Sequence, residues 1–346
     1  MRTQRMASHN SQTGRDLAHL NRRSFVQAIG AASLAGAGLP QVLADQAVGP
    51  KRTDPAESAV ARLFKTMNDE QRKILCFPFD HPLRTRIGNN WAITKPKIED
   101  LKPEQQELSR EIFKNLTSED GYERYMKQMD DDYGGFEGYH IAIFGEPDSD
   151  KPFEWVLSGR HDTLRADGNS ADGVAFGGPI FYGHAAAGNF DENPAHTANV
   201  WWYQGEMANK IFKTLDDKQQ ASALIDKKIA DDARSIKLAG DALPASGLAI
   251  KTLDGQQKAM VKQLIEAGTR PFRKADVDEL MANVEGSGGV DAMRLTFYKE
   301  GDIGNDGTWD VWKLEGPAFS WYFHGHPHVH TWLNVAKDAK FDKSHG

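Results

Sequence analysis

Apolar residues in this sequence recur at helical spacing over several long stretches. Between residues 55 and 75 they stand three or four positions apart, as at Val60, Leu63, Phe64 and Met67, and this period predicts an amphipathic helix. Comparable patterns predict helices at about 103–116, 119–130, 205–230, 254–266 and 276–284. Three helix starts place Asn or Asp three residues before Gln, which satisfies free backbone amides: Asn68 and Gln71, Asp216 and Gln219, and Asp254 and Gln257.

Other apolar stretches are short and bounded by turn residues, which is typical of β-strands. Residues 139–145 and 153–158 flank a polar turn and predict a hairpin. A third strand from His161 to Arg165 and a fourth around 174–176 would complete an antiparallel meander. The C-terminal third contains a second group of predicted strands, at 293–298, 309–314, 319–323 and 329–335.

The order of these elements indicates the fold class. Helices alternate with groups of antiparallel strands, and the regular strand-helix-strand alternation of a parallel sheet is missing. We therefore expect an α+β fold in which two β-meanders pack with several helices. Residues 46–346 are few enough to form this fold as a single domain.

The first 45 residues have the pattern of a twin-arginine signal peptide. A basic opening leads to the pair Arg22-Arg23, a weakly apolar run from Ala28 to Leu39 follows, and the segment around Ala44 suits cleavage. The apolar run is too short to span a bilayer. We therefore expect the twin-arginine export machinery to deliver the protein to the periplasm or the exterior. Because this pathway carries folded proteins, often with a cofactor inserted, it favours a bound metal or cofactor.

Composition and charge exclude some classes of function. Hydrophobic residues make up 39% of the chain, which indicates a folded protein. The net charge of −7 and the lack of a basic stripe argue against nucleic acid as a partner. Cys76 is the only cysteine, so a disulfide within one chain is impossible.

Familiar catalytic motifs are missing from the sequence. The glycine-rich stretch 177–184 has neither the P-loop lysine nor the dinucleotide-binding spacing, and no Gly-x-Ser-x-Gly elbow occurs. Cys76 lies between Leu75 and Phe77, which favours a buried, inert thiol over a nucleophile.

Two polar stretches have both a functional and a structural interpretation. Asp80, His81, Arg84 and Arg86 could bind an anionic or sugar-like substrate, although a solvated loop is the commoner meaning. Residues 130–132 are three consecutive aspartates that could attract a hard cation, although a surface acidic run is commoner.

Four histidines within seven residues carry the most informative chemistry: His324, His326, His328 and His330. Neutral imidazole is the commonest protein ligand for Zn, Cu, Ni and Fe. Because side chains alternate along a strand, His328 and His330 would share one face about 6–7 Å apart, close enough to hold one ion. Pro327 should end any strand through His324 and His326, so their part in the site stays open.

A third ligand must come from another segment, and His161 is the preferred candidate because it also lies in a predicted strand. Asp162 is an alternative ligand or an orienting carboxylate. A lone histidine is more often a hydrogen-bonded core residue, and that alternative stays open for His161. His140, His184 and His196 are further candidates of lower weight.

Several motifs together resemble a known family. They are Trp155 to Gly159 with Arg160-His161, the stretch 178–183, Leu215-Asp216, Glu315-Gly316-Pro317 and the ending 328–332. Over most of residues 60–340 the sequence resembles the uncharacterised bacterial family catalogued as domain of unknown function 3500. Members usually carry Gly-His-His-Leu where this chain has Gly159-Arg160-His161-Asp162, and they end in His-x-His-Thr. The resemblance therefore implies His161, His328 and His330 as the matching set, and it implies no reaction.

Two classes of function follow. In the first, three histidines hold a divalent transition metal with one position open for water or a small-molecule substrate. Zn would support hydrolysis or lyase chemistry, Cu or Fe would support oxidation, and Asp162 or Glu315 could act as general base or orienting group. In the second, the chain is a non-catalytic periplasmic protein that binds a metal or small solute. A site closed by four protein ligands would favour the second class.

Overall fold

The computed structural model describes residues 48–187, 198–304, 306–342 and 344, so the predicted signal peptide lies outside the described residues. The described strands form one sheet in the order β1-β2-β3-β4-β5-β11-β10-β9-β8-β6, with β7 beside β8. Their bounds are β1 Cys76–Phe77, β2 His140–Gly145, β3 Phe153–Gly159, β4 Asp162–Ala166, β5 Ile180–His184, β6 Leu224–Ile225, β7 Leu248–Ala249, β8 Arg294–Tyr298, β9 Val311–Gly316, β10 Phe319–His324 and β11 Val329–Val335. The sheet is mostly antiparallel, and the predicted α+β class is confirmed.

The two predicted strand groups are joined into this sheet by a single pairing. Strand β5 lies antiparallel to β11, with Val329 opposite His184 and His330 opposite Gly183. The meander β2-β3-β4-β5 therefore continues directly into β11-β10-β9-β8. Residues near 160 and residues near 330 become neighbours through this pairing, although they are far apart in the sequence.

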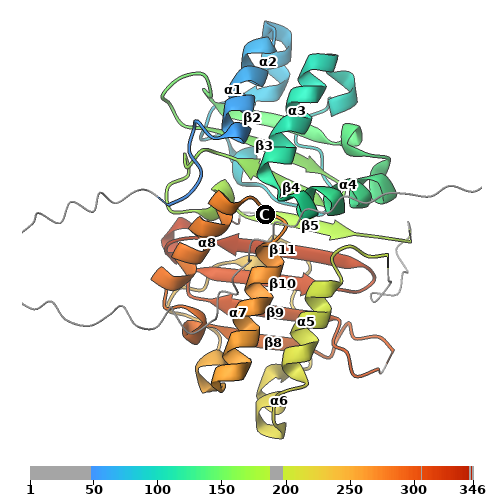
Figure 1. Cartoon of the computed structure of the whole chain (residues 1–346), viewed down its shortest axis with the longest axis vertical. Helices are drawn as coiled ribbons and strands as arrows, with labels where there is room; N and C mark the ends of the chain where they lie inside the picture. Colours follow the sequence, from blue (N-terminus) through green and yellow to red (C-terminus); the bar gives the residue numbers. More distant parts are fainter. Residues whose placement is uncertain (1–47, 188–197, 305, 343, 345–346) are drawn as a thin grey trace, which may run out of the picture. The chain divides into compact units, whose positions relative to one another are not determined.

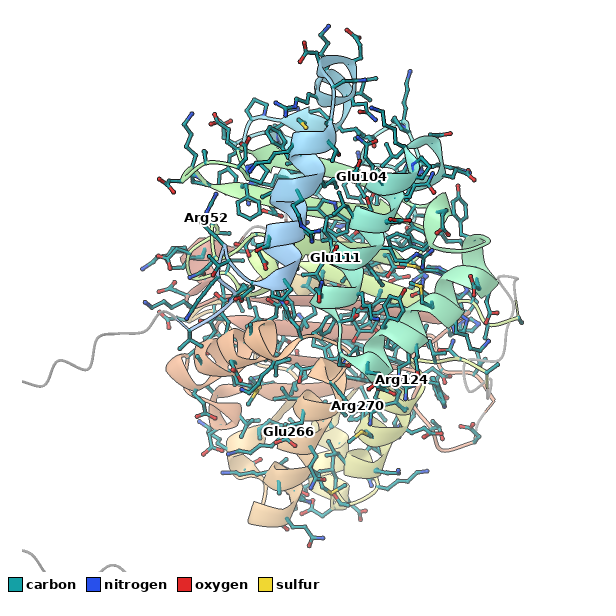
Figure 2. The ribbon with its side chains drawn as sticks, turned by 45° about the horizontal axis from the view of Figure 1, so that its top comes forward. Arg52, Glu104, Glu111, Arg124, Glu266 and Arg270 are labelled. Carbon is teal, nitrogen blue, oxygen red and sulfur yellow. The ribbon has the colours of Figure 1, made fainter. Side chains whose placement is uncertain are left out.

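Helices cover one face of the sheet, as Figure 1 shows. Their bounds are α1 Pro55–Thr66, α2 Asp69–Leu75, α3 Pro103–Leu116, α4 Glu119–Tyr133, α5 Tyr203–Phe212, α6 Asp217–Ala223, α7 Gly255–Thr269 and α8 Lys274–Gly286. Their apolar sides pack on alternate strand residues such as Tyr182, Trp321 and Leu333. Their outer sides are charged, as Figure 2 shows for Glu104 and Glu111 on α3 and Arg124 on α4.

The opposite face of the sheet is covered by non-helical segments, and we call it the loop face. It is formed by the other alternate residues, including Phe181, Tyr322 and Trp332, on which Ala233 and Ile236 pack. Further along the sheet, Trp91 and Ile93 cover Val156 and its neighbours. Both faces of the strands are thus buried, which explains why the strands lack a regular alternation of polar and apolar residues.

Several predicted elements differ from the observed ones. The capping boxes at Asn68, Asp216 and Asp254 are all present. Asn68 divides the predicted helix 55–75 into α1 and α2. The predicted helix 205–230 is two helices that end at Ala223, because a second cap at Asp216 starts a new helix.

The strand predictions also need two corrections. Strand β4 begins at Asp162, and His161 lies in the preceding turn with a positive φ of 61°. The predicted strand around 174–176 is a short 3₁₀ segment, Ala175–Gly177, in which Phe176 and Gly177 have positive φ. The fourth strand of the meander is β5, which begins after Gly178-Pro179.

Helix α8 carries a buried carboxyl group with a consequence for stability. Glu279 is 5% exposed, and burial together with the neighbouring Asp167 and Asp276 raises its pKa from 4.5 to about 9. Folding therefore favours the protonated form of this side chain. The stabilising contribution is fully present below pH 4.5 and is lost as pH rises toward 9, where the buried carboxylate becomes ionised.

We expect Glu279→Gln to remove this pH dependence. Because one pKa unit corresponds to about 1.36 kcal/mol, wild type should lose roughly 5 kcal/mol of unfolding free energy between pH 5 and pH 9 through this group, and the neutral isostere should lose correspondingly less. Urea unfolding at a series of pH values measures the difference. Glu285→Gln, at an exposed position of the same helix, is the control and should leave the profile unchanged. Parallel profiles for Glu279→Gln and wild type would contradict the assignment.

Candidate metal centre

Three buried histidines from two distant segments meet on one side of the sheet. His161 comes from the β3–β4 turn, His328 directly precedes β11, and His330 lies within β11. Their Nε2 atoms are 3.1 Å (His161 to His328), 3.3 Å (His161 to His330) and 3.0 Å (His328 to His330) apart. The three residues are 3%, 2% and 6% exposed. The structure thus brings together all three predicted metal ligands.

Backbone pairing around Gly183 places the three rings. The Gly183 N–H donates to the carbonyl of His161 at 3.0 Å, while Gly183 stands opposite His330 in the β5–β11 pair. A Cβ at position 183 would lie 2.4 Å from the carbonyl oxygen of Val329 and 3.2 Å from the His330 ring. Only glycine therefore lets β11 and the His161 turn approach β5 this closely.

The turn that presents His161 is itself constrained. Its residues join Gly159 to Asp162, and the His161 N–H donates to the carbonyl of Asn89 at 2.8 Å. A positive φ is uncommon for a residue other than glycine and costs of order 1 kcal/mol. Such conformations gather at functional sites, and here the strained residue is the one whose ring enters the cluster.

Two carboxylates, one fully buried and one partly exposed, determine which ring nitrogens carry hydrogen. His161 Nδ1 lies 2.6 Å from Asp132 Oδ2, and His330 Nδ1 lies 2.6 Å from Asp231 Oδ2. An ionised carboxylate only accepts hydrogen bonds, so each neutral imidazole carries its hydrogen on Nδ1. The Nε2 atoms of His161 and His330 then face each other as lone pairs. A cation between the two lone pairs would be attracted by both of them. Histidines oriented by carboxylates in this way are typical of metal sites.

Burial keeps two of the imidazoles, those of His161 and His328, in the form that binds metals. Burial is the main cause that lowers the pKa of His161 well below its ordinary value. Burial and the neighbouring His330 and His161 lower the pKa of His328 to about 2. Neutral imidazole is the ligating species, so these shifts favour a metal ion over protons at neutral pH.

The spacing of the three nitrogens suits one ion with a further position open. In a tetrahedral zinc site with Zn–N bonds of about 2.0–2.1 Å, the ligand nitrogens stand about 3.3–3.4 Å apart. The observed separations of 3.0–3.3 Å are close to this value. The buried cluster could therefore hold a metal ion on three protein ligands.

A second group, formed by Asp231, His324 and His330, could also hold a metal by spacing alone. Its hydrogen bonds favour a different role. Asp231 accepts from His330 at 2.6 Å and from the Trp332 indole at 2.8 Å, and Lys228 Nζ lies 2.9 Å from His324 Nε2. Donors already surround Asp231, and an ammonium group lies beside His324. Asp231 and His324 therefore support the ligand His330, and they are not assigned as ligands themselves.

The two predicted catalytic carboxylates lie apart from the three rings. Asp162 is adjacent to His161 in sequence, but its Oδ2 accepts from Gln128 of α4 at 2.9 Å, and burial raises its pKa well above the ordinary value. Glu315 forms an ion pair with Lys313 at 2.6 Å. It lies four residues along β9 from Val311, the residue opposite His324. The structure therefore does not bring Glu315 to the histidines.

Sequence reasoning missed the two carboxylates that orient the ligands. The run 130–132 is not merely a surface feature, because the Asp132 side chain is fully buried against His161. Asp131 accepts from His184 Nε2 at 3.0 Å, and the Ala185 N–H donates to Asp132. The sequence feature that could have identified Asp132 was the acidic run 130–132 at the end of a predicted helix. No sequence feature pointed to Asp231, which follows directly after the predicted helix 205–230.

The other histidine candidates have different roles. His140 is bonded through Nδ1 to the carbonyl of Pro96 at 2.9 Å, away from the cluster. His184 pairs with Asp131 beside the centre. His326 is partly exposed and belongs to neither group of candidate ligands, and His196 lies outside the described residues.

The polar loop at residues 80–86 has a structural role. Arg84 and Arg165 both form ion pairs with the fully buried Glu154, at 2.6 and 2.7 Å. The Arg86 guanidinium lies over the Trp91 ring, 4.9 Å from its centroid. The arginines thus fix the loop onto the sheet, which neither the substrate-binding nor the solvated-loop interpretation anticipated.

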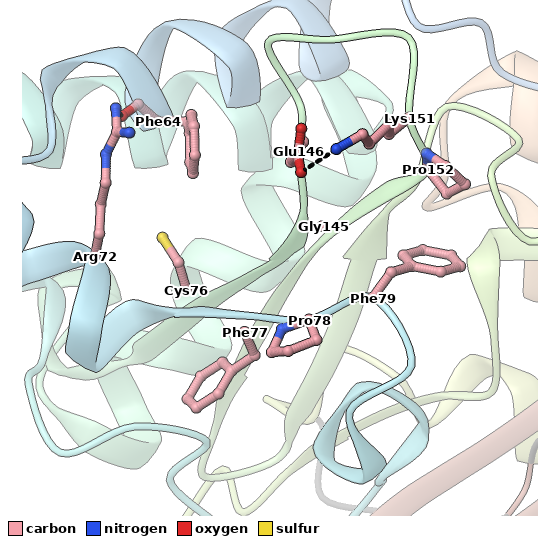
Figure 3. A pocket seen from close by; sticks show the side chains of 10 residues that line it. All are labelled: Phe64, Arg72, Cys76, Phe77, Pro78, Phe79, Gly145, Glu146, Lys151 and Pro152. Atoms are coloured by element: carbon pink, nitrogen blue, oxygen red, sulfur yellow. Dashed lines mark hydrogen bonds and ion pairs between the residues drawn. The ribbon is translucent and has the colours of Figure 1, made fainter.

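A cavity of about 530 Å³ lies at the β1 edge of the sheet, lined mainly by Phe64, Phe77 and Phe79 (Figure 3). Cys76 points into it, and burial raises the pKa of its thiol to about 11. The thiol is therefore protonated at neutral pH, as expected for an inert cysteine. A second cavity, of about 400 Å³, is lined by Asn89, Asp231 and Trp332 among others. It therefore lies beside the carboxylate that bonds to the ligand His330.

Fold and site together define an α+β protein whose single described sheet carries a buried histidine cluster that could hold a metal ion. The chain belongs to the family described as protein of unknown function (DUF3500), whose model matches residues 50–340. The resemblance seen in the sequence motifs is thereby confirmed. No curated protein and no solved structure matches the chain. No helix among the described residues is long and apolar enough to cross a membrane.

Proposed function

We propose that this protein is an exported, metal-dependent enzyme that acts on a small molecule, with the ion held by His161, His328 and His330. The observation that carries the proposal is the meeting of three Nε2 atoms at 3.0–3.3 Å while carboxylates fix the Nδ1 hydrogens of two rings. Three protein ligands leave a position for water or substrate, as catalytic sites do.

The chemistry depends on the ion. A set of three imidazoles suits Zn, Cu or Fe. Zn would activate water or polarise a carbonyl for hydrolysis or lyase chemistry, while Cu or Fe would support oxidation. Asp162 and Glu315 are not part of the proposal as bases, because their side chains bond to Gln128 and Lys313.

The second candidate is a non-catalytic protein that binds a metal or a small solute. The near-complete burial of the three rings, at 2–6% exposure, favours it, since a carrier encloses its ion. The two candidates differ in whether the protein ligands leave one coordination position of the ion free: the enzyme would have a free position, and the carrier would not.

We expect the purified mature protein to hold about one transition-metal ion per chain, and His161→Ala, His328→Ala and His330→Ala each to lose it, because each removes one of three ligands. Elemental analysis after dialysis measures the content. His140→Ala removes a buried histidine outside the cluster and should retain the ion. Unchanged metal content in the three cluster variants would contradict the proposed ligand set.

Cobalt substitution should reveal the open position. Co²⁺ on three imidazoles and a water gives strong visible absorption of tetrahedral type, and azide should shift these bands by replacing the water. An absorption spectrum that azide leaves unchanged would indicate a closed site and support the carrier.

Export rests on the leader at residues 1–45. We expect Arg22→Lys combined with Arg23→Lys to retain the protein inside the cell, because the pathway reads the arginine pair. Arg2→Lys combined with Arg5→Lys, outside the pair, should be exported normally. Cell fractionation and immunoblotting measure the distribution, and equal export of both double variants would contradict the twin-arginine route.

A further inference from the structure

We infer that Asp231 is the positioning residue of the metal centre and that a small carboxylate from solvent can take its place. The inference rests on the proposed function, since it concerns the ligand His330. It goes further in two ways. It assigns to Asp231 the orientation of the ligand His330, and it names small carboxylates as molecules that enter the adjacent cavity.

Asp231 holds His330 in the ligating tautomer. Its Oδ2 accepts from His330 Nδ1 at 2.6 Å, and its Oδ1 accepts from Trp332 Nε1 at 2.8 Å. His330 and Trp332 are two residues apart in β11, so both side chains point to the loop face. One carboxylate therefore fixes the orientation of the ring and the strand that carries it.

The segment that carries Asp231 is anchored to the sheet on both sides of this residue. The Tyr322 hydroxyl donates to the carbonyl of Ile229 at 3.2 Å, and the Asn334 amide donates to the carbonyl of Ile236 at 3.1 Å. Ala233 and Ile236 pack on the loop face. Removal of the Asp231 carboxylate therefore leaves the surrounding backbone in place.

Asp231 differs from Asp132 in its access to solvent. The Asp231 side chain is 24% exposed and lines the 400 Å³ cavity, which is also bounded by Asn89, Trp332 and the Asp232–Arg234 ion pair. The Asp132 side chain, which orients His161, is fully buried. A molecule in the cavity can therefore reach the place of the Asp231 carboxylate, and Asp132 is not among the residues that line this cavity.

Charge favours an anion at this place. In Asp231→Ala, the Nδ1–H of His330 and the Nε1–H of Trp332 would lose their acceptor. The ammonium of Lys228, 2.9 Å from His324, and a bound metal cation would remain nearby without a compensating carboxylate. Formate has the missing charge and acceptor oxygens, and it has the same heavy atoms as the carboxylate that Asp231→Ala removes.

Zinc affinity of four forms tests the inference: wild type, Asp231→Ala, Asp231→Asn and Asp132→Ala. Competition with a chromophoric chelator measures the affinity with and without formate at matched ionic strength. Loss of an orienting carboxylate typically lowers affinity about 10–100-fold, and we expect this for both alanine variants. Formate should restore most of the loss in Asp231→Ala and none in Asp132→Ala or in Asp231→Asn, whose amide fills the space.

The inference would be overturned if Asp231→Ala bound zinc as tightly as wild type. It would also be overturned if formate failed to restore the affinity of Asp231→Ala, or restored that of the other variants as well. Thermal unfolding checks that each variant is folded. If Asp231→Ala does not fold, Asp231→Gly with formate in the refolding buffer replaces it, and failure of formate to restore this variant also counts against the inference.

A readout without metal separates this inference from the proposed function. In the metal-free protein, ¹⁵N chemical shifts of His330 should show the Nδ1–H tautomer in wild type, a mixture in Asp231→Ala, and the Nδ1–H tautomer again when formate is added. Wild type that binds no zinc but shows this tautomer pattern would overturn the metal proposal and leave the positioning role standing. Identical ring shifts in wild type and Asp231→Ala would overturn the positioning role whatever the zinc result.

Discussion

The antiparallel pairing of β5 with β11 is the interaction on which the rest of the structure depends. It joins two strand groups into one sheet and sets Gly183 opposite His330. The same glycine donates its N–H to the carbonyl of His161, so one backbone position locates both halves of the histidine cluster. Because a side-chain carbon at this position would meet the carbonyl of Val329, the close approach of these segments requires glycine.

The cluster is a buried polar network that is supported from two separate segments. Asp132 comes from α4, on the helix-covered face, and Asp231 comes from the segment that follows β6 on the loop face. Both carboxylates accept from a ring Nδ1, which turns the two Nε2 lone pairs toward one point. Buried polar groups are costly unless satisfied, and here a metal ion would satisfy the three inward nitrogens. The arrangement differs from the Glu154 ion pairs, where every charge already has a partner of opposite sign.

The sequence by itself determined much of the local structure and the identity of the ligands. Helix periodicity and capping pairs located most helices, and the α+β class followed from the order of elements. The density of histidines at 324–330 pointed to the ligands His328 and His330, and His161 was added from its place in a predicted strand and then by the family motifs. The predictions of individual elements were wrong where tertiary contacts override the local sequence pattern. The segment after Ala223 leaves helical structure to cover the loop face, and His161 occupies a turn instead of a strand.

Only the tertiary structure decided which carboxylates serve the site. Asp162 and Glu315 are close to histidines or to strand motifs in the sequence, yet their side chains bond to Gln128 and Lys313. Asp132 belonged to an acidic run with a surface or cation-binding interpretation, and Asp231 followed a predicted helix without any motif. Strand pairing and helix packing brought both to the rings. The physical reason is that a pattern records which residues prefer burial and at what spacing, whereas hydrogen bonds between residues 29 and 99 positions apart exist only once the chain has folded.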